Sequence, residues 1–167
     1  MPDTVRKAAA QGRYWHATRL LDDHLDELSD TTPAVRLLAA RLNAGWGNWP
    51  TVRRLLDGQP WLDTLGGGAG WALLGRARAT LGDPEGGANA FAEYLAVADL
   101  DPEQRGLTEL RRGLALARAG STGPALAAFD RAAEQIPWFA DWVSYLAAEA
   151  AAEAGEPAEV ERRLATA

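Results

Sequence analysis

The sequence contains no cysteine, a single lysine (Lys7) and only two histidines in 167 residues. The absence of cysteine excludes disulfide bonds, thiolate zinc sites and cysteine nucleophiles. His16 and His24 lie eight positions apart on one predicted helix, which is about 12 Å along its axis at about 1.5 Å per residue. That separation is too large for both to bind one metal ion. We therefore expect no metal ion and no cofactor.

Basic residues are outnumbered by acidic ones, 17 against 23, and long apolar runs are lacking. The formal net charge is −6, which disfavours nucleic acid as a general partner. No apolar run approaches the roughly 20 residues of a membrane-spanning helix, and the N-terminus does not resemble a signal peptide. The sequence leaves both a cytoplasmic and a periplasmic location open, because an export signal could lie outside it.

β-Branched aliphatic residues are few, with one isoleucine and six valines against 35 alanines and 23 leucines. Alanine and leucine are strong helix formers, whereas β-branched residues favour strands. The composition therefore predicts an all-α protein.

What the sequence does contain is an internal repeat marked by glycine. The gaps between successive members are 35, 35, 38 and 35 residues, for Gly12, Gly47, Gly82, Gly120 and Gly155. Such a period in an Ala/Leu-rich chain is typical of stacked helical hairpins. Glycine is favoured where a helix ends in a turn. We predict a right-handed α-solenoid of about five hairpins forming one domain over residues 1–167, with these five turn glycines inside the hairpins.

Residues at fixed offsets from the turn glycines support this repeat. Nine positions after them stand large apolar residues: Leu21, Leu56, Phe91, Phe129 and Leu164. Seven positions before them stand small or medium-sized residues: Val5, Ala40, Gly75, Gly113 and Ala148. We predict that the smaller residues let the two helices of each hairpin approach, while the large residue fills the seam between them.

The repeat also predicts where the helices lie. The expected ranges are 4–11, 13–28, 33–43, 49–57, 69–81, 84–98, 102–119, 122–135, 137–154 and 157–166. Pro33, Pro102 and Pro137 are placed to open first helices of hairpins. The glycine-rich stretch from Gly58 to Gly70 predicts a loop between the second and third hairpins.

The third and fourth repeats resemble the tetratricopeptide repeat (TPR) family. The early Trp-Leu-Gly pattern of that family is matched by Trp71, Leu74 and Gly75. Its later pattern is matched by Gly113, Ala125, Phe129, Ala132 and Pro137. The other repeats keep only the turn glycine and the seam positions, so they are TPR-like. This resemblance implies an architecture rather than an activity.

Several tryptophan-containing segments are similar in order and style to the N-terminal superhelical region of bacterial soluble lytic murein transglycosylases. They are residues 12–21, 44–49, 59–63 and 140–142. In that family a helical solenoid precedes a lysozyme-like domain, whose catalytic glutamate stands in a Glu-Ser pair and which cleaves peptidoglycan. This sequence has no Glu-Ser pair. The resemblance thus implies a periplasmic, non-catalytic region, with peptidoglycan reached through an adjoining catalytic domain outside this chain.

The first helices of stacked hairpins line a concave groove. Arg41 and Arg76 occupy equivalent positions there, each six residues before a turn glycine, and we predict that they bind a carboxylate or another anion. The alternative is pairing with Asp or Glu of the chain itself. The TPR clamp for C-terminal carboxylates uses Lys and Asn, which are absent from the matching positions. Other residues predicted to face the groove are Leu37, Ala72, Leu110, Leu114, Trp142, Tyr145 and Glu149.

Aromatic residues provide a second candidate site. Trp138, Phe139, Trp142 and Tyr145 cluster near the start of the last long helix. Aromatic rings stack on sugars and anchor protein interfaces, so this cluster is a candidate ligand patch. The alternative is that it caps the core of the fourth hairpin. Trp49 and Trp71 are expected to pack between helices.

The sequence therefore predicts a non-catalytic interaction or scaffolding module for a protein or peptide partner. Two hypotheses stay open: the superhelical region of a periplasmic lytic transglycosylase, or a free-standing cytoplasmic TPR adaptor that binds a peptide in its concave groove. The short first hairpin and the absence of a polar capping helix at the end of the chain predict a fragment of a longer protein, or weak self-association through one end.

Overall fold

A computed structural model describes residues 3–25 and 32–165 of the chain. Within them ten α-helices and two 3-10 turns follow one another without a strand, which confirms the all-α prediction. The elements are α1 (Asp3–Ala10), α2 (Tyr14–Leu25), α3 (Pro33–Gly45), α4 (Trp49–Leu56), η1 (Leu65–Gly68), α5 (Ala69–Thr80), α6 (Pro84–Val97), α7 (Pro102–Arg118), α8 (Thr122–Gln135), η2 (Pro137–Phe139), α9 (Ala140–Glu153) and α10 (Pro157–Leu164).

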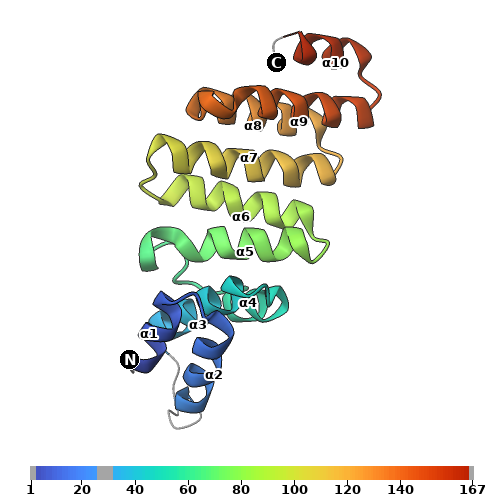
Figure 1. The fold of residues 1–167 in the computed structure, drawn as a ribbon. Helices are drawn as coiled ribbons and strands as arrows, with labels where there is room; N and C mark the ends of the chain where they lie inside the picture. The colour runs from blue at the N-terminus through green and yellow to red at the C-terminus, as the bar shows by residue number, and fades with distance from the viewer. Residues whose placement is uncertain (1–2, 26–31, 166–167) are drawn as a thin grey trace.

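The helices stack as five successive hairpins in an elongated array, with α1 and α10 at opposite ends of the stack (Figure 1). Each helix packs against the next one along the chain. The buried apolar side chains form a row of small cores, one centred on α3 to α6 and another on α7 to α9, with a third beneath α1 to α3. The predicted α-solenoid is confirmed.

The five turn glycines adopt the same left-handed backbone conformation, with φ between 70° and 85°. A residue with a Cβ atom rarely adopts this φ, which explains the choice of glycine. One backbone hydrogen bond recurs after each of them, from the next residue's N–H to the carbonyl five positions earlier. Its pairs are Arg13 to Ala8, Asn48 to Asn43, Asp83 to Arg78, Ser121 to Leu116 and Glu156 to Ala151. The predicted turns are therefore confirmed at all five positions.

The seams of the third and fourth hairpins place a phenylalanine ring against a glycine. A Cβ atom on Gly75 would lie 2.9 Å from the ring of Phe91, and one on Gly113 would lie 2.7 Å from the ring of Phe129. In the first two hairpins the buried large residue is a leucine, and the facing position holds Val5 or Ala40. A larger ring is thus matched by a smaller partner, as close packing requires.

The fifth hairpin departs from the predicted seam, because Leu164 is 52% exposed. The prediction that it fills a seam is wrong, since α10 has eight residues and lies at the end of the stack (Figure 1). A charged residue holds α10 instead. Arg163 is buried, its Nε donates to Glu159 at 2.7 Å, and its guanidinium pairs with Asp130 of α8. Hydrogen bonds from Arg162 and Arg163 lower the pKa of Glu159 to about 2.

The linker between the second and third hairpins is confirmed as non-α-helical over residues 57–68, with α5 beginning at Ala69. Gly66, Gly67 and Gly68 all have positive φ. The prediction for Pro137 is wrong in detail, because it opens the 3-10 turn η2 and the α-helix begins at Ala140. The N–H of Ala140 donates to the carbonyl of Pro137, which is the tighter 3-10 spacing.

Candidate functional site

The first helices of the hairpins carry a row of charged side chains at one repeat position. Six residues before the turn glycines stand Arg6, Arg41, Arg76, Leu114 and Glu149. All four charged members are exposed, and no described residue forms an ion pair with any of them. We call the surface formed by α1, α3, α5, α7 and α9 the first-helix face. The chain itself thus leaves Arg41 and Arg76 without acidic partners in the described structure.

Arg76 instead lies over an aromatic ring. Its guanidinium carbon is 4.8 Å from the ring centre of Trp49, which is cation–π geometry. Trp49 and Trp71 are both half-buried against the core of α3 to α6, as expected for packing between helices. The indole N–H of Trp71 donates to Asp63 at 2.7 Å.

A hollow of about 140 Å³ lies between α5 and α7 on this face. Arg76, Arg111 and Arg118 line it together with the partly exposed side chain of Leu114, and the buried Phe91 adjoins it. We call it the arginine pocket. None of its three arginines pairs with a carboxylate of the described residues. Three cations that converge without a counterion form a surface suited to an anion.

Arg111 shows the electrostatic consequence of this arrangement. Desolvation by surrounding protein atoms lowers the pKa of its guanidinium below the ordinary arginine value, and the nearby charge of Arg76 lowers that pKa further. The charged form of Arg111 is therefore held in an environment that an anion would stabilise.

Several other arginines of the stack have acidic partners, unlike the three that line the pocket. Arg78 pairs with Asp57, and hydrogen bonding to Arg78 lowers the pKa of that carboxyl. Arg131 donates from Nε and Nη2 to both oxygens of Glu109, at 2.7 and 3.2 Å. The carboxylates of Asp57 and Glu109 therefore bind other arginines and not those of the arginine pocket.

The aromatic cluster lies at the beginning of α9 and is largely exposed. Trp138 is 68%, Trp142 50% and Tyr145 47% exposed. The rings of Trp142 and Tyr145 stack, with centres 5.3 Å apart and planes 21° from parallel. Of these four aromatic residues, Phe139 alone packs against the core of α7 to α9. The alternative prediction, that the cluster caps the core of the fourth hairpin, therefore holds for Phe139 and not for the other three.

The prediction that Leu37 and Leu110 line the groove is wrong. Leu37 and Leu110 are buried in the cores of the stack. Leu37 packs under the linker, where a Cβ atom on Gly66 would lie 2.9 Å from its Cδ2. Leu114 is partly exposed and lines the arginine pocket. The first-helix face is consequently more polar than the sequence suggested.

Sequence reasoning missed Arg111 and Arg118, which lie nine and two residues before Gly120 rather than six. Their role in the pocket depends on how α7 is rotated against α5. A signal was nevertheless present, because α7 carries four arginines and its buried residues mark which side faces the core.

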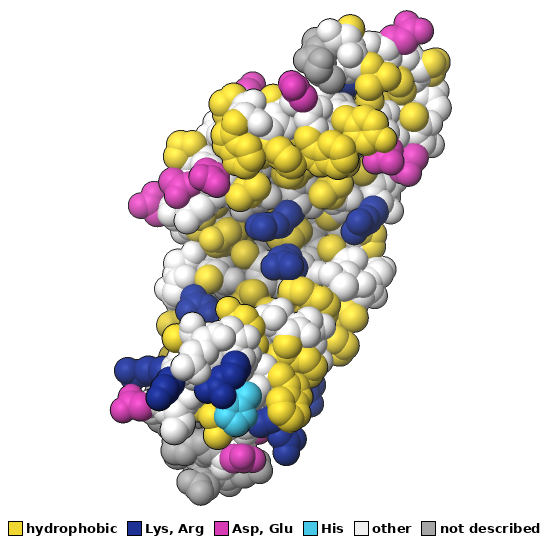
Figure 2. Space-filling view, in the orientation of Figure 1, with side chains coloured by type: hydrophobic (Ala, Val, Ile, Leu, Met, Phe, Trp, Pro, Cys, Tyr) yellow, Lys and Arg dark blue, Asp and Glu magenta, His cyan; other side chains and the backbone are white. Residues whose placement is uncertain are grey.

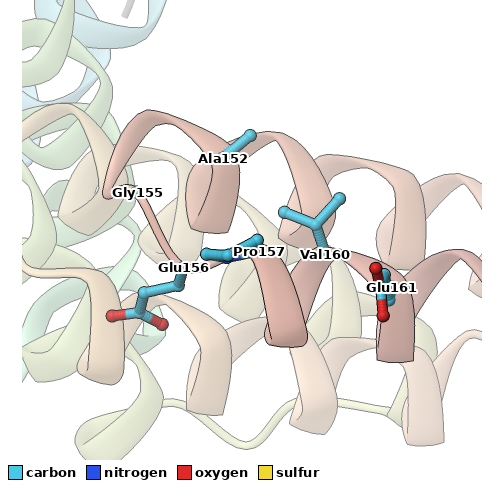
Figure 3. Close-up of a pocket in the computed structure, with 6 residues that line it drawn as sticks. All are labelled: Ala152, Gly155, Glu156, Pro157, Val160 and Glu161. Carbon is cyan, nitrogen blue, oxygen red and sulfur yellow. The ribbon is translucent and has the colours of Figure 1, made fainter.

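A second hollow, of about 380 Å³, lies at the turn between α9 and α10 (Figure 3). Ala152, Pro157 and Val160 line it, with the carboxylates of Glu156 and Glu161 at opposite ends of the row (Figure 3). It contains no basic or aromatic side chain, so it offers little directional recognition.

Two further observations bear on the kind of site. No group of three or more His, Cys, Asp or Glu residues in the described ranges could hold a metal ion. Within the same ranges, none of the helices combines the length and apolar character needed to cross a membrane.

Comparison with known proteins identifies the fold. No family model matches the sequence, and no curated protein matches it. The crystal structure of MamA is similar, with a TM-score of 0.78 at 16% sequence identity, over 98% of this chain and 92% of that chain. MamA is a TPR-like helical repeat protein. None of these three comparisons supports the resemblance to lytic murein transglycosylases. The chain therefore has the fold of the TPR-like helical repeat proteins.

Proposed function

We propose that this protein is a non-catalytic scaffold that binds a carboxylate-bearing peptide segment of a partner protein in the arginine pocket. The observation that carries the proposal is the convergence of Arg76, Arg111 and Arg118 on one hollow without an acidic partner. The helical repeat fold supports an interaction role, because stacked hairpins present extended surfaces to ligands.

The chemistry of the pocket favours a carboxylate. Guanidinium groups bind carboxylates through two parallel hydrogen bonds, which are stronger than bonds between neutral groups. Leu114, which is partly exposed, adds apolar surface that the methylene groups of a glutamate side chain would contact. The hollow of about 140 Å³ suits a single side chain rather than a helix.

The test is a titration of the protein with fluorescent ten-residue peptides that carry one Glu or the matched Gln. We expect the Glu peptide to bind more tightly, and Arg111→Gln to weaken it by roughly 10- to 100-fold, because a charge-assisted hydrogen bond contributes about 1.5–3 kcal/mol. Arg54→Gln is the matched control, since Arg54 is an exposed arginine of α4 away from the pocket. Equal weakening by both substitutions, or no preference for Glu over Gln, would contradict the proposal.

The full-length protein to which this scaffold belongs, and its compartment, are a separate proposal with two alternatives. The similarity of the tryptophan-containing segments supports the superhelical region of a periplasmic lytic transglycosylase. The alternative is a free-standing cytoplasmic TPR adaptor, which would use a peptide-binding pocket of this kind. The gene sequence after residue 167 distinguishes them. A lysozyme-like segment with a Glu-Ser pair supports the first, whereas a stop codon or further repeats support the second.

Two assays on the isolated chain accompany this comparison. We expect no muramidase activity from it in either form. Weak self-association through one end of the stack stays a prediction, and sedimentation as a monomer at high concentration would contradict it.

A further inference from the structure

The charge of the first-helix face reverses along the stack. Arg6, Arg41 and Arg76 are followed at the same repeat position by Leu114 and then by Glu149. Two residues before the turn glycines, Arg118 of α7 is followed by Glu153 of α9. The same position relative to the turn therefore carries opposite charge at the two ends.

The composition of whole helices reinforces this reversal. α3 and α5 contain arginine but neither Asp nor Glu. α9 contains Asp141, Glu149 and Glu153, all exposed, but neither Lys nor Arg. No described residue forms an ion pair with these three carboxylates. The face is thus positive from α3 to α7 and negative on α9.

The negative end also carries the aromatic rings. Trp142, Tyr145 and Glu149 are spaced by three and four residues on α9, so they lie along one side of that helix. Figure 2 shows arginine side chains (dark blue) over α5 to α7, with a band of hydrophobic side chains over α8 and α9 on the same face of the molecule. The basic and aromatic regions are therefore open to one ligand.

Exposed rings beside carboxylates without partners are suited to a cation. A Lys or Arg side chain near the face of a Trp ring is attracted by its π-electrons, and a nearby carboxylate adds to that attraction. The chain already contains one such contact, between Arg76 and Trp49. An apolar ligand group would cover the rings but leave Glu149 and Glu153 without a counterion.

We propose that the first-helix face binds a dipolar peptide, with an acidic residue in the arginine pocket and a Lys or Arg residue on the Trp142–Tyr145 platform beside Glu149. This inference rests on the proposed function and specifies its ligand. The charge reversal orients the peptide, because the opposite placement would bring like charges together at both ends.

The spacing of the helices sets the spacing in the ligand. Packed helices lie about 8–10 Å apart, and the platform is one to two helix spacings from a pocket that lies between α5 and α7. An extended peptide advances about 3.3 Å per residue. The acidic and basic residues should therefore be separated by about three to six positions.

The test compares two otherwise identical fluorescent peptides that contain one Glu and, four positions away, either Lys or Gln. We expect the Glu/Lys peptide to bind wild type roughly 10-fold more tightly than the Glu/Gln peptide at low salt. Trp142→Ala should remove this difference, and Glu149→Lys should reverse it, so that Glu/Gln becomes the preferred peptide. Circular dichroism would check that both variants remain folded.

Glu161→Lys is the matched control, because it makes the same charge change on α10, at the turn hollow. It should keep the preference for Glu/Lys. Equal binding of both peptides to wild type, or the same response to Glu161→Lys as to Glu149→Lys, would overturn the dipolar ligand. If the dipolar ligand fails but the Glu/Gln peptide still binds in a way that depends on Arg111, the proposed function stands. If the protein prefers neither Glu over Gln at the pocket nor Lys over Gln at the platform, both proposals fail.

Discussion

The hairpin seams and the first-helix face are built from the same repeats but vary in different ways. In the seams, equivalent residues change size together, so that Gly faces Phe and Ala or Val accompanies Leu. On the first-helix face, equivalent residues change charge, from Arg76 to Glu149. The seam therefore determines the architecture, and the face can differ from repeat to repeat without disturbing it.

The largest loss of stability is expected when a charged residue is placed in a seam, and this tests the difference between seams and the first-helix face. Phe129→Asp should lower the free energy of unfolding by about 4 kcal/mol or more, because it combines a lost buried ring with an unpaired buried carboxylate. Phe91→Asp should behave similarly. Urea denaturation measures the change, and thermal melts unaltered by either substitution would show that the assigned seam register is wrong.

Size compensation within a seam can be tested by copying one hairpin into another. Gly75→Ala should destabilise by about 1–3 kcal/mol, because its Cβ atom would lie 2.9 Å from the Phe91 ring. Combining it with Phe91→Leu recreates the Ala40 and Leu56 pairing of the second hairpin. We expect the double variant to be more stable than the sum of the single effects predicts. A double-mutant cycle measures the coupling, and strict additivity would refute compensation.

The charged attachment of α10 should respond to acid, unlike the apolar seams. The pKa of Glu159 is about 2 in the folded protein, against 4.5 ordinarily. A lowered folded-state pKa stabilises the fold above pH 4.5, and this contribution is lost as the pH falls from about 4.5 to about 2. The stability difference between wild type and Glu159→Gln should therefore shrink over that interval. A constant difference between the two unfolding curves would contradict this ion-pair account.

The smallest expected change in stability lies on the first-helix face. Arg41→Ala should alter the free energy of unfolding by less than about 0.5 kcal/mol, because the residue is exposed and has no ion pair with described residues. Arg76→Ala should cost at most about 1 kcal/mol, from loss of its contact with Trp49. Calorimetric melting would test both, and losses as large as those in the seams would show that this face is structural.

Much of the fold could be predicted from sequence because the turn glycines and seam residues obey local rules. A positive φ almost requires glycine, and a close helix approach requires a small residue facing a large one. These constraints recur at fixed spacing, so the repeat revealed them. Leu164 obeyed the same spacing but is exposed, since burial depends on neighbouring helices as well as on position in the repeat.

The candidate site was less predictable because it depends on the relation between hairpins. Leu37 and Leu110 were expected in the groove, but packing between successive layers buries them. Arg111 reaches the arginine pocket from a different repeat position than Arg76. Such placements depend on the rotation and offset of one hairpin against the next, which periodicity alone does not specify.

The most direct test of the central claim is a map of backbone amide chemical shifts during titration with the Glu/Lys peptide. The account predicts shift changes concentrated on α5, α7 and α9, near Arg76, Arg111 and Trp142, with little change on α4, α6 and α8. Changes centred on the second helices, or on the hollow at the α9–α10 turn, would contradict it.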